Sequence, residues 1–186
     1  GGLDLVVAAA GRDEPTPGEL VTWGQVRRLF DLNVVGAAAT LLPLVPRMRG
    51  RGRGHLVAIS SLAAQCPLPG GAPYGASKAA LSYLLEALAD DLAPLGIAVT
   101  LVEPGFVETP MTARHPFPMP FAVSADRAAA VIDRAIRRRV RRVRFPWPLV
   151  LLVRLGGLVP ARLRAAILRW AVPRACGTAG VEGLSP

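Results

Sequence analysis

Gly54-His55-Leu56-Val57-Ala58-Ile59-Ser60-Ser61 contains a short apolar run, Leu56 to Ile59, over which a strand is predicted. Leucines at helical spacing follow over residues 74–93, and a second apolar run covers residues 97–102. Runs that are apolar at successive positions are typical of strands covered on both faces. The order strand, helix, strand therefore predicts two parallel strands joined by a right-handed helical crossover.

The same alternation extends to the N-terminal part of the chain. A strand is predicted over residues 3–7, a helix over residues 19–30, and a second helical stretch over residues 32–49. Pro43 and Pro46 should kink and then end this second stretch, because proline lacks a backbone N–H. The fold class is thus predicted to be α/β, a Rossmann-like doubly wound parallel sheet that binds ligands at the carboxyl ends of its strands.

Tyr74 and Lys78 stand four residues apart at the start of the strongest helix, so they share one face of it. A nearby ammonium favours the phenolate, so Lys78 is predicted to lower the pKa of Tyr74 from its ordinary value near 10. A tyrosine tuned in this way can exchange a proton with an alcohol or a carbonyl. Ser61 is a candidate to hydrogen-bond the same substrate oxygen. Alone, the pair is also compatible with an ordinary surface helix start.

Four motifs in this order resemble the short-chain dehydrogenase/reductase family over about residues 3–125. They are Ser61 at a strand end, the Tyr74/Lys78 pair after 12 intervening residues, Asn33 in Leu32-Asn33-Val34-Val35-Gly36, and Glu103-Pro104-Gly105-Phe106-Val107-Glu108-Thr109-Pro110. The resemblance implies an NAD- or NADP-dependent oxidoreductase that interconverts an alcohol and a carbonyl. The catalytic residues that it implies are Asn33, Ser61, Tyr74 and Lys78. The cofactor-binding residues that it implies are Ala10, Gly11, Tyr74, Lys78, Pro104, Gly105, Val107 and Thr109.

The resemblance also implies a role for each side chain. Tyr74 is the general acid when a carbonyl is reduced, and Lys78 holds the nicotinamide ribose. Ser61 supports the charge that develops on the substrate oxygen. Asn33 holds a water in a proton relay to Lys78. The backbone of Val107 and the Thr109 side chain fix the carboxamide of the cofactor.

The sequence departs from the family in two places. No glycine-rich phosphate-binding turn precedes residues 3–7, so the chain resembles the C-terminal two thirds of a member and is expected to be N-terminally truncated. Ala8-Ala9-Ala10-Gly11 stands where the family has an asparagine, so Ala9 lacks an amide that would tie neighbouring strands. The rival hypothesis is a catalytically incompetent remnant that binds a membrane or another subunit.

An apolar segment rich in proline follows the Pro-Gly turn. In the family this region folds over the substrate, which implies an apolar carbonyl or alcohol here. Packing of the same side chains on the core or on a partner subunit is the alternative. The side chains concerned are Phe106, Met111, Phe117, Met119 and Phe121.

The C-terminal part of the chain is basic and apolar, and we assign residues 1–133 to a partial catalytic domain and residues 134–186 to a helical extension. The formal net charge is +9, and no acidic residue occurs from 134 to 181. An anionic membrane surface and packing on the fold or a partner subunit both explain this composition. Nucleic acid is disfavoured, because an arginine cluster alone provides no base-reading element.

Cysteine and histidine content bounds the chemistry further. Two cysteines and two histidines show neither a disulfide framework nor metal-ligand spacing, so no metal site is predicted. The expected location is a reducing compartment, the cytoplasm, with membrane association as the alternative. The family resemblance implies a homo-oligomer formed through the helices that carry Asn33 and Lys78.

Overall fold

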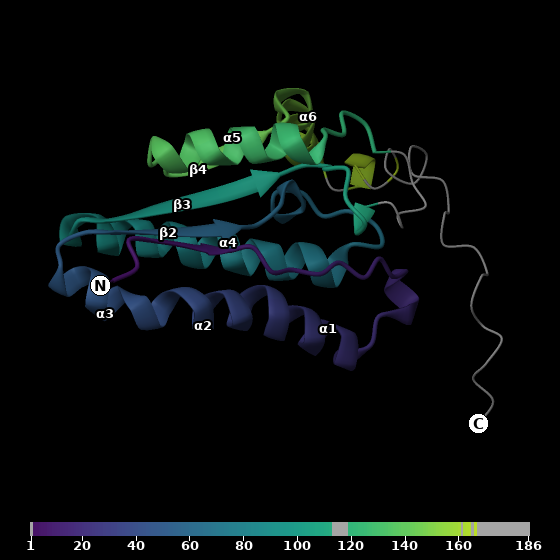
Figure 1. Cartoon of the computed structure of the whole chain (residues 1–186). Helices are drawn as coiled ribbons and strands as arrows, with labels where there is room; N and C mark the ends of the chain where they lie inside the picture. Colours follow the sequence, from purple (N-terminus) through teal and green to yellow (C-terminus); the bar gives the residue numbers. More distant parts are fainter. Residues whose placement is uncertain (1, 113–118, 161, 165, 167–186) are drawn as a thin grey trace.

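Four parallel strands with helices on both faces make up the computed structural model, which describes residues 2–112, 119–160, 162–164 and 166 (Figure 1). The strands lie in the order β1-β2-β3-β4. Their bounds are Leu5–Ala8 for β1, Gly54–Ile59 for β2, Ile97–Pro104 for β3 and Arg142–Phe145 for β4. The predicted α/β class and parallel sheet are confirmed.

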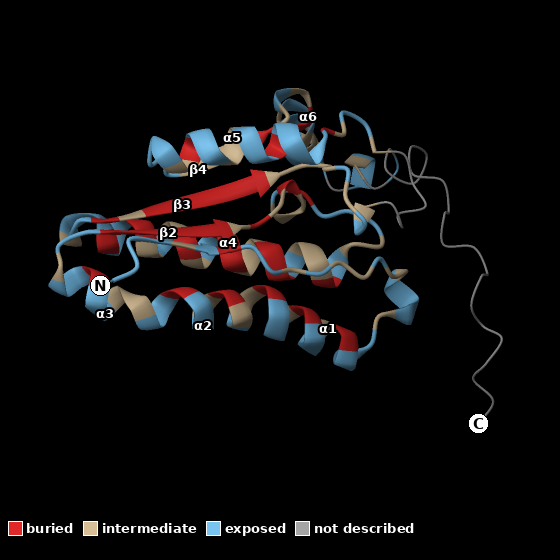
Figure 2. Cartoon of the chain, viewed as in Figure 1, coloured by how far each residue is buried: buried red, intermediate tan, exposed pale blue. Residues whose placement is uncertain are grey.

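β2 and β3 occupy the middle of the sheet and are almost wholly buried (Figure 2). Gly54 pairs with Ile97 at the start of their register, and Leu101 of β3 pairs with Arg142 of β4. Their continuous apolar runs are explained by this position, because both faces of each strand are covered by helices. β1 pairs with β2 only, within the described residues, and its side chains are more exposed.

One face of the sheet is covered by a long helix and by α4 (Figure 1). The long helix comprises α1 (Trp23–Phe30), a π-helical turn η2 (Asp31–Gly36), α2 (Ala37–Leu41), a 3₁₀ turn η3 (Leu42–Leu44) and α3 (Val45–Gly50). α4 spans Ala72–Leu92 and is preceded by the short turn η4 (Leu62–Ala64). The opposite face carries α5 (Ala125–Arg137), and α6 (Trp147–Leu158) follows β4.

The two helical stretches predicted over residues 19–30 and 32–49 form one continuous helix, Trp23–Gly50. It starts later than predicted because Thr22 caps it, accepting a hydrogen bond from the backbone N–H of Gln25 at 3.2 Å. The prediction that Pro43 and Pro46 end the helix is wrong. Pro43 lies in the tighter turn η3 and Pro46 in the first turn of α3, where a missing N–H is tolerated.

By length and composition, Trp23–Gly50 is the one described helix that could cross a membrane. Core helices meet the same criterion. Here Leu29, Asn33 and Leu41 of this helix are buried against the rest of the fold. The helix thus packs on the fold along one stripe, and 22% of its most apolar 18-residue window is buried.

The core divides into two apolar clusters, one on each face of the sheet. Side chains that alternate along β2 point to opposite faces, so Leu56 belongs to one cluster and Val57 to the other. The first cluster joins the sheet to the long helix and α4, and the second joins it to α5. Phe145 of β4 belongs to the second cluster.

β4 and α6 lie beyond residue 133, in the part that the sequence analysis assigned to an extension. β4 nevertheless hydrogen-bonds to β3 over four register positions. Several of the clustered arginines are ion-paired in the fold: Arg137 with Asp133, Arg141 with Asp90, and Arg142 and Arg144 with Glu103.

Candidate active site

Ser61 and Tyr74 meet at the carboxyl end of β2. Ser61 follows the strand and caps η4, where its Oγ accepts a hydrogen bond from the backbone N–H of Ala63 at 3.1 Å. α4 begins at Ala72 with Pro73 in its first turn, which places Tyr74 at the N-terminal end of the helix. A side-chain hydrogen bond joins Ser61 to Tyr74. The structure thus brings together two predicted catalytic residues that are 13 positions apart.

Lys78 lies one turn further along α4, and its side chain is buried. Its Nζ donates a hydrogen bond to the backbone carbonyl of Ile59 at 2.9 Å. The same nitrogen lies 5.9 Å from the centre of the Tyr74 ring, within the range of a cation–π contact. The ammonium is therefore fixed against the end of β2 and over the phenol ring.

The prediction that Lys78 lowers the pKa of Tyr74 is wrong for this structure. Burial raises the pKa of Tyr74 to about 12; the hydrogen bond with Ser61 lowers the pKa in part, and the negative charge of Asp13 raises it. Burial also lowers the pKa of Lys78 to about 8, against the influence of Asp13. The phenol is therefore protonated at neutral pH.

Asp13 is a residue of this site that sequence reasoning missed. It follows Gly11-Arg12 in the segment after β1, and its charge acts on both Tyr74 and Lys78. The sequence holds one weak signal, a carboxylate just past a strand that ends at the same edge of the sheet as β2.

Asn33 joins the segment after β1 to α4. Its Oδ1 accepts a hydrogen bond from the backbone N–H of Arg12 at 2.9 Å. Its Nδ2 donates to the carbonyl of Arg12 at 3.0 Å and to Oγ of Ser77 at 2.9 Å. Both amide hydrogens are thus used within the protein, next to Lys78. A water held by this side chain would have to donate to Oδ1, so the relay role stays a prediction.

Gly11 lies directly against the side chains of Asn33 and Lys78. A Cβ added at Gly11 would lie 3.0 Å from Nζ of Lys78 and 3.3 Å from Oδ1 of Asn33. Ala9 and Ala10, in contrast, are exposed. Gly11 is therefore the member of the Ala-Ala-Ala-Gly segment that borders the site, because only a residue without a side chain fits there without displacing Lys78.

The Pro104-Gly105 turn is bound to the end of β4 and to α6. The backbone N–H of Gly105 donates to the carbonyl of Phe145 at 2.7 Å. A Cβ at Gly105 would collide with Leu149 and would lie 3.3 Å from Leu62. This glycine therefore admits the close approach of α6 to the turn η4 that follows Ser61.

Thr112 organises the loop that carries Val107 and Thr109, and sequence reasoning missed it. Its Oγ1 donates to the carbonyl of Val107 at 2.6 Å and accepts from the backbone N–H of Thr109 at 2.9 Å. Val107 also pairs with Val123 in an isolated parallel bridge. The signal was a second threonine at turn spacing, Thr109-Pro110-Met111-Thr112.

The predicted apolar lid is only partly described. Met111 and Phe121 are exposed beside this loop. Phe117, and His115 near it, lie outside the described residues. The prediction that this segment covers a substrate therefore stays a prediction.

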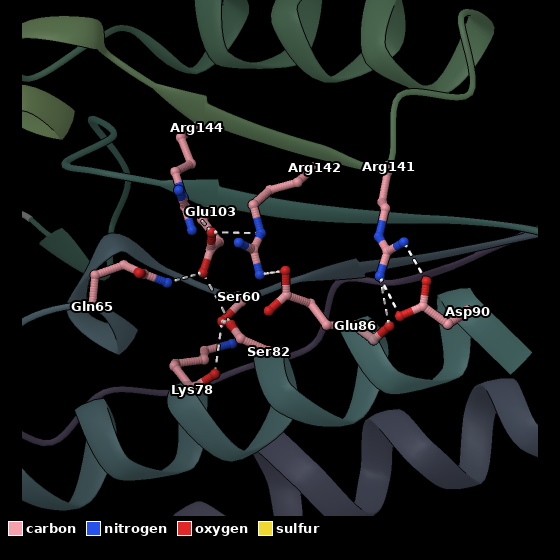
Figure 3. Close-up of polar contacts among 10 residues, drawn as sticks. All are labelled: Ser60, Gln65, Lys78, Ser82, Glu86, Asp90, Glu103, Arg141, Arg142 and Arg144. Carbon is pink, nitrogen blue, oxygen red and sulfur yellow. Dashed lines mark hydrogen bonds and ion pairs between the residues drawn. The ribbon is translucent and has the colours of Figure 1, made fainter. Parts of the chain in front are cut away.

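A buried carboxylate, Glu103, connects the site to β4 (Figure 3). Its Oε1 accepts from Nε2 of Gln65 at 2.6 Å and from Oγ of Ser82 at 3.2 Å. Its Oε2 accepts from Nε of Arg144 at 2.6 Å, and Arg142 adds an ion pair at 3.4 Å. The carboxylate thus neutralises two arginines of the cluster that the sequence analysis interpreted as a basic tail.

The same network reaches the catalytic turn. Oγ of Ser82 lies 2.8 Å from Oγ of Ser60, which donates to the carbonyl of Lys78 at 2.9 Å. Gln65 ends the turn that Ser61 begins. Glu103 therefore ties the Ser61 turn, α4 and β4 together. Sequence reasoning used Glu103 only as the start of a motif, because no local pattern shows which side chains surround it.

Comparison with known proteins agrees with the geometry. The family model described as short chain dehydrogenase matches residues 1–116. An uncharacterized oxidoreductase of Myxococcus xanthus is 45% identical over 169 residues, which cover 91% of this chain and 67% of the relative. The chain belongs to the short-chain dehydrogenase family. This membership confirms the resemblance inferred from the four motifs, and it makes the protein one of a class of NAD(P)-dependent oxidoreductases.

Solved structures of the family share the fold. A short-chain dehydrogenase from Streptomyces avermitilis has a TM-score of 0.68 at 31% identity, covering 91% of this chain and 69% of its own. A gluconate 5-dehydrogenase from Burkholderia cenocepacia, in complex with NADP and tartrate, has a TM-score of 0.58 at 28% identity and covers 60% and 44%. The chain spans about two thirds of the length of the Myxococcus xanthus relative and of the Streptomyces avermitilis dehydrogenase.

Proposed function

We propose that this short-chain dehydrogenase interconverts an alcohol and a carbonyl, with Tyr74 as the proton-transfer residue. The observation that carries the proposal is the hydrogen bond between Ser61 and Tyr74, with the buried Lys78 ammonium over the phenol ring. The group lies at the carboxyl end of β2, where open α/β sheets bind their ligands.

The protonation state of Tyr74 favours the reducing direction. A phenol with a pKa near 12 enters the reaction protonated, so it can donate its proton to the oxygen of a carbonyl. The Ser61 hydroxyl, hydrogen-bonded to the phenol, would orient that oxygen and stabilise its developing charge. Lys78 would stabilise the phenolate that remains after the proton has left.

The residues of this edge fit the nicotinamide half of an NAD or NADP cofactor. Gly11 leaves Nζ of Lys78 approachable, and Lys78 and Tyr74 offer a cation and a hydroxyl to ribose oxygens. The backbone of Val107 and the hydroxyl of Thr109 would hold the carboxamide. When bound, the cofactor would supply the hydride. The NADP in the related gluconate 5-dehydrogenase supports this assignment but does not select between the two cofactors.

An apolar substrate is proposed from the side chains beside the Pro-Gly turn. Met111 and Phe121 are exposed next to the loop of Val107 and Thr109, where they would contact a substrate bound at Tyr74. Exposed apolar side chains at the border of a site favour an apolar ligand.

The proposal is tested by titration with NADH and NADPH, followed by reduced-nicotinamide fluorescence, and then by turnover with a panel of apolar ketones and aldehydes. Saturable binding is expected. Tyr74→Phe should lower kcat by about 10²–10⁴-fold and weaken cofactor binding far less, because Lys78, Val107 and Thr109 would still hold the cofactor. Tyr83→Phe is the matched control, because Tyr83 is exposed on the same helix. Turnover of Tyr74→Phe close to that of the unmodified protein would refute the role of Tyr74.

A further inference from the structure

α6 carries an apolar stripe that faces solvent. The stripe consists of Trp147, Leu151, Leu155 and Leu158, which are 75%, 50%, 53% and 81% exposed. Their spacing of four, four and three residues places them on one face of the helix. Figure 2 shows α6 largely in the colours of exposed and half-buried residues. A surface helix ordinarily presents polar side chains to water, so this face is unusual.

The opposite side of α6 is fixed to the body of the protein. Leu149 is buried and faces Gly105, and a Cβ at Gly156 would lie 4.0 Å from Sγ of Cys66. α6 also contacts β4. α6 therefore cannot rotate to bury its apolar stripe, because the opposite side of the helix already packs on the protein.

The charges around the stripe are of one sign. Arg154 is the only charged residue of α6, and Arg162 follows it; both are exposed, and neither forms an ion pair within the part of the chain that the structure describes. In the sequence, every charged residue from 146 to 181 is an arginine. Anionic lipid headgroups would complement this surface. A second copy meeting the same face across a two-fold axis would bring like charges together.

The length of the stripe determines how a membrane would be met. Twelve residues of helix extend only about 18 Å, which is shorter than the hydrocarbon core of a bilayer. A tryptophan at one end and an arginine beside the stripe are typical of a helix that lies in the interface. We propose that the α6 stripe docks on an anionic membrane surface, with the helix parallel to that surface.

This docking would bring the candidate site close to lipid. α6 rests against the Gly105 turn, close to Leu62 in the turn after Ser61 and to Cys66 just past that turn. An apolar substrate could then reach the site from the bilayer. The docking itself does not depend on the proposed oxidoreductase activity, so the two can fail separately.

The test is sedimentation of the chain with phosphatidylcholine vesicles, with and without phosphatidylglycerol. Binding is expected to be about 10-fold stronger to the anionic vesicles and to weaken with salt. Leu155→Asp should lower the partition coefficient about 10-fold or more, because it puts a charge into the apolar face. Leu20→Asp is the matched control: Leu20 is 58% exposed on the 3₁₀ turn Gly18–Leu20, and the change in charge is identical.

A second pair of variants tests the charge. Arg154→Gln should weaken binding to anionic vesicles about 5-fold, since each basic residue near the surface contributes about 1 kcal/mol. Arg47→Gln on α3, across the sheet from α6, should leave binding unchanged (Figure 1). Equal binding of Leu155→Asp and Leu20→Asp, or no binding by the folded protein, would overturn the proposal. So would a Leu155-dependent dimer in solution without vesicle binding.

Discussion

At the scale of single residues, the electrostatic state of the site depends on burial more than on the Tyr74/Lys78 pair itself. The two side chains are one helical turn apart, as their spacing requires, yet the pKa of Tyr74 rises to about 12 and that of Lys78 falls to about 8. Each shift favours the neutral form, because removing a charge from water costs more free energy than the contact between Lys78 and Tyr74 gains. Asp13 adds a negative charge that opposes the phenolate.

Lys78 is the only lysine of the chain, so its titration can be followed by itself. Reductive methylation with isotope-labelled formaldehyde, read by NMR, should report a pKa near 8 for Lys78. Asp13→Asn should lower this pKa further, because the Asp13 charge favours the ammonium. Asp4→Asn is the control, because Asp4 is an exposed carboxylate at the amino end of β1, opposite to the end that borders the site. A Lys78 pKa near 10.5 would contradict the structure.

The same shift makes stability depend on pH. Because the pKa of Lys78 is about 8 in the folded protein and 10.5 when unfolded, the unfolded chain binds more protons between these values. The contribution of Lys78 to the free energy of unfolding should therefore rise with pH across this window. Urea unfolding at several pH values measures it, and the rise should be missing in Lys78→Met.

At the scale of the elements, the Glu103 network holds three pieces of the site together. Gln65 comes from the end of the Ser61 turn, Ser82 from α4 and Arg144 from β4 (Figure 3). Elements that are distant in sequence thus share one carboxylate. Removing a buried charge with several partners costs much stability, because each partner then loses its hydrogen bond or ion pair.

Glu103→Leu should lower the free energy of unfolding by about 3–5 kcal/mol, because it leaves the half-buried Arg144 guanidinium without its carboxylate partner. Asp90→Asn removes a carboxylate from the exposed pair with Arg141 and should change stability little. Chemical denaturation compares the two. Equal effects of both variants would mean that Glu103 does not link these elements.

A second element-scale prediction concerns the attachment of α6. Leu149→Ala should lower the free energy of unfolding by about 2–5 kcal/mol, because it empties the contact with the Gly105 turn. Leu151→Ala, on the solvent side of the same helix, should change stability by less than about 0.5 kcal/mol. A small loss for both variants would show that α6 is not packed as described.

At the scale of the whole molecule, Asn33 connects parts of the chain that are 21 and 44 residues away. The π-helical turn η2 carries it inside the long helix, and such turns occur frequently at functional sites. The amide fixes the segment after β1 against α4. Asn33 therefore helps to hold the edge that contains Gly11, Asp13 and Lys78.

Asn33→Ala should lower the free energy of unfolding by about 1–3 kcal/mol for each group that loses its partner. Amide hydrogen exchange should rise selectively over residues 9–13. Thr40→Ala is the control, because Thr40 is exposed on the same helix and, among the residues that the structure describes, its hydroxyl bonds to the carbonyl of Gly36 alone. Unchanged exchange over residues 9–13 in Asn33→Ala would contradict this role.

The sequence alone determined β1, β2, β3, the helix α4 and the family. Apolar runs and leucine spacing are local patterns, so Gly54–Ile59, Ile97–Pro104 and Ala72–Leu92 were found to within two residues at most ends. The motifs around Asn33, Ser61, Tyr74 and Lys78 identified the family for the same reason, because the order and spacing of these residues can be read from the linear sequence.

Only the tertiary structure decided the charges and partners of those residues. The direction of the Tyr74 pKa shift depends on how deeply the phenol is buried, and burial comes from elements far away in sequence. The arginines of residues 141–144 are read as a basic tail in the sequence, but β4 pairs with β3 and places two of them on Glu103. A linear pattern shows which side chains alternate, whereas the packing of distant elements sets which side chains meet.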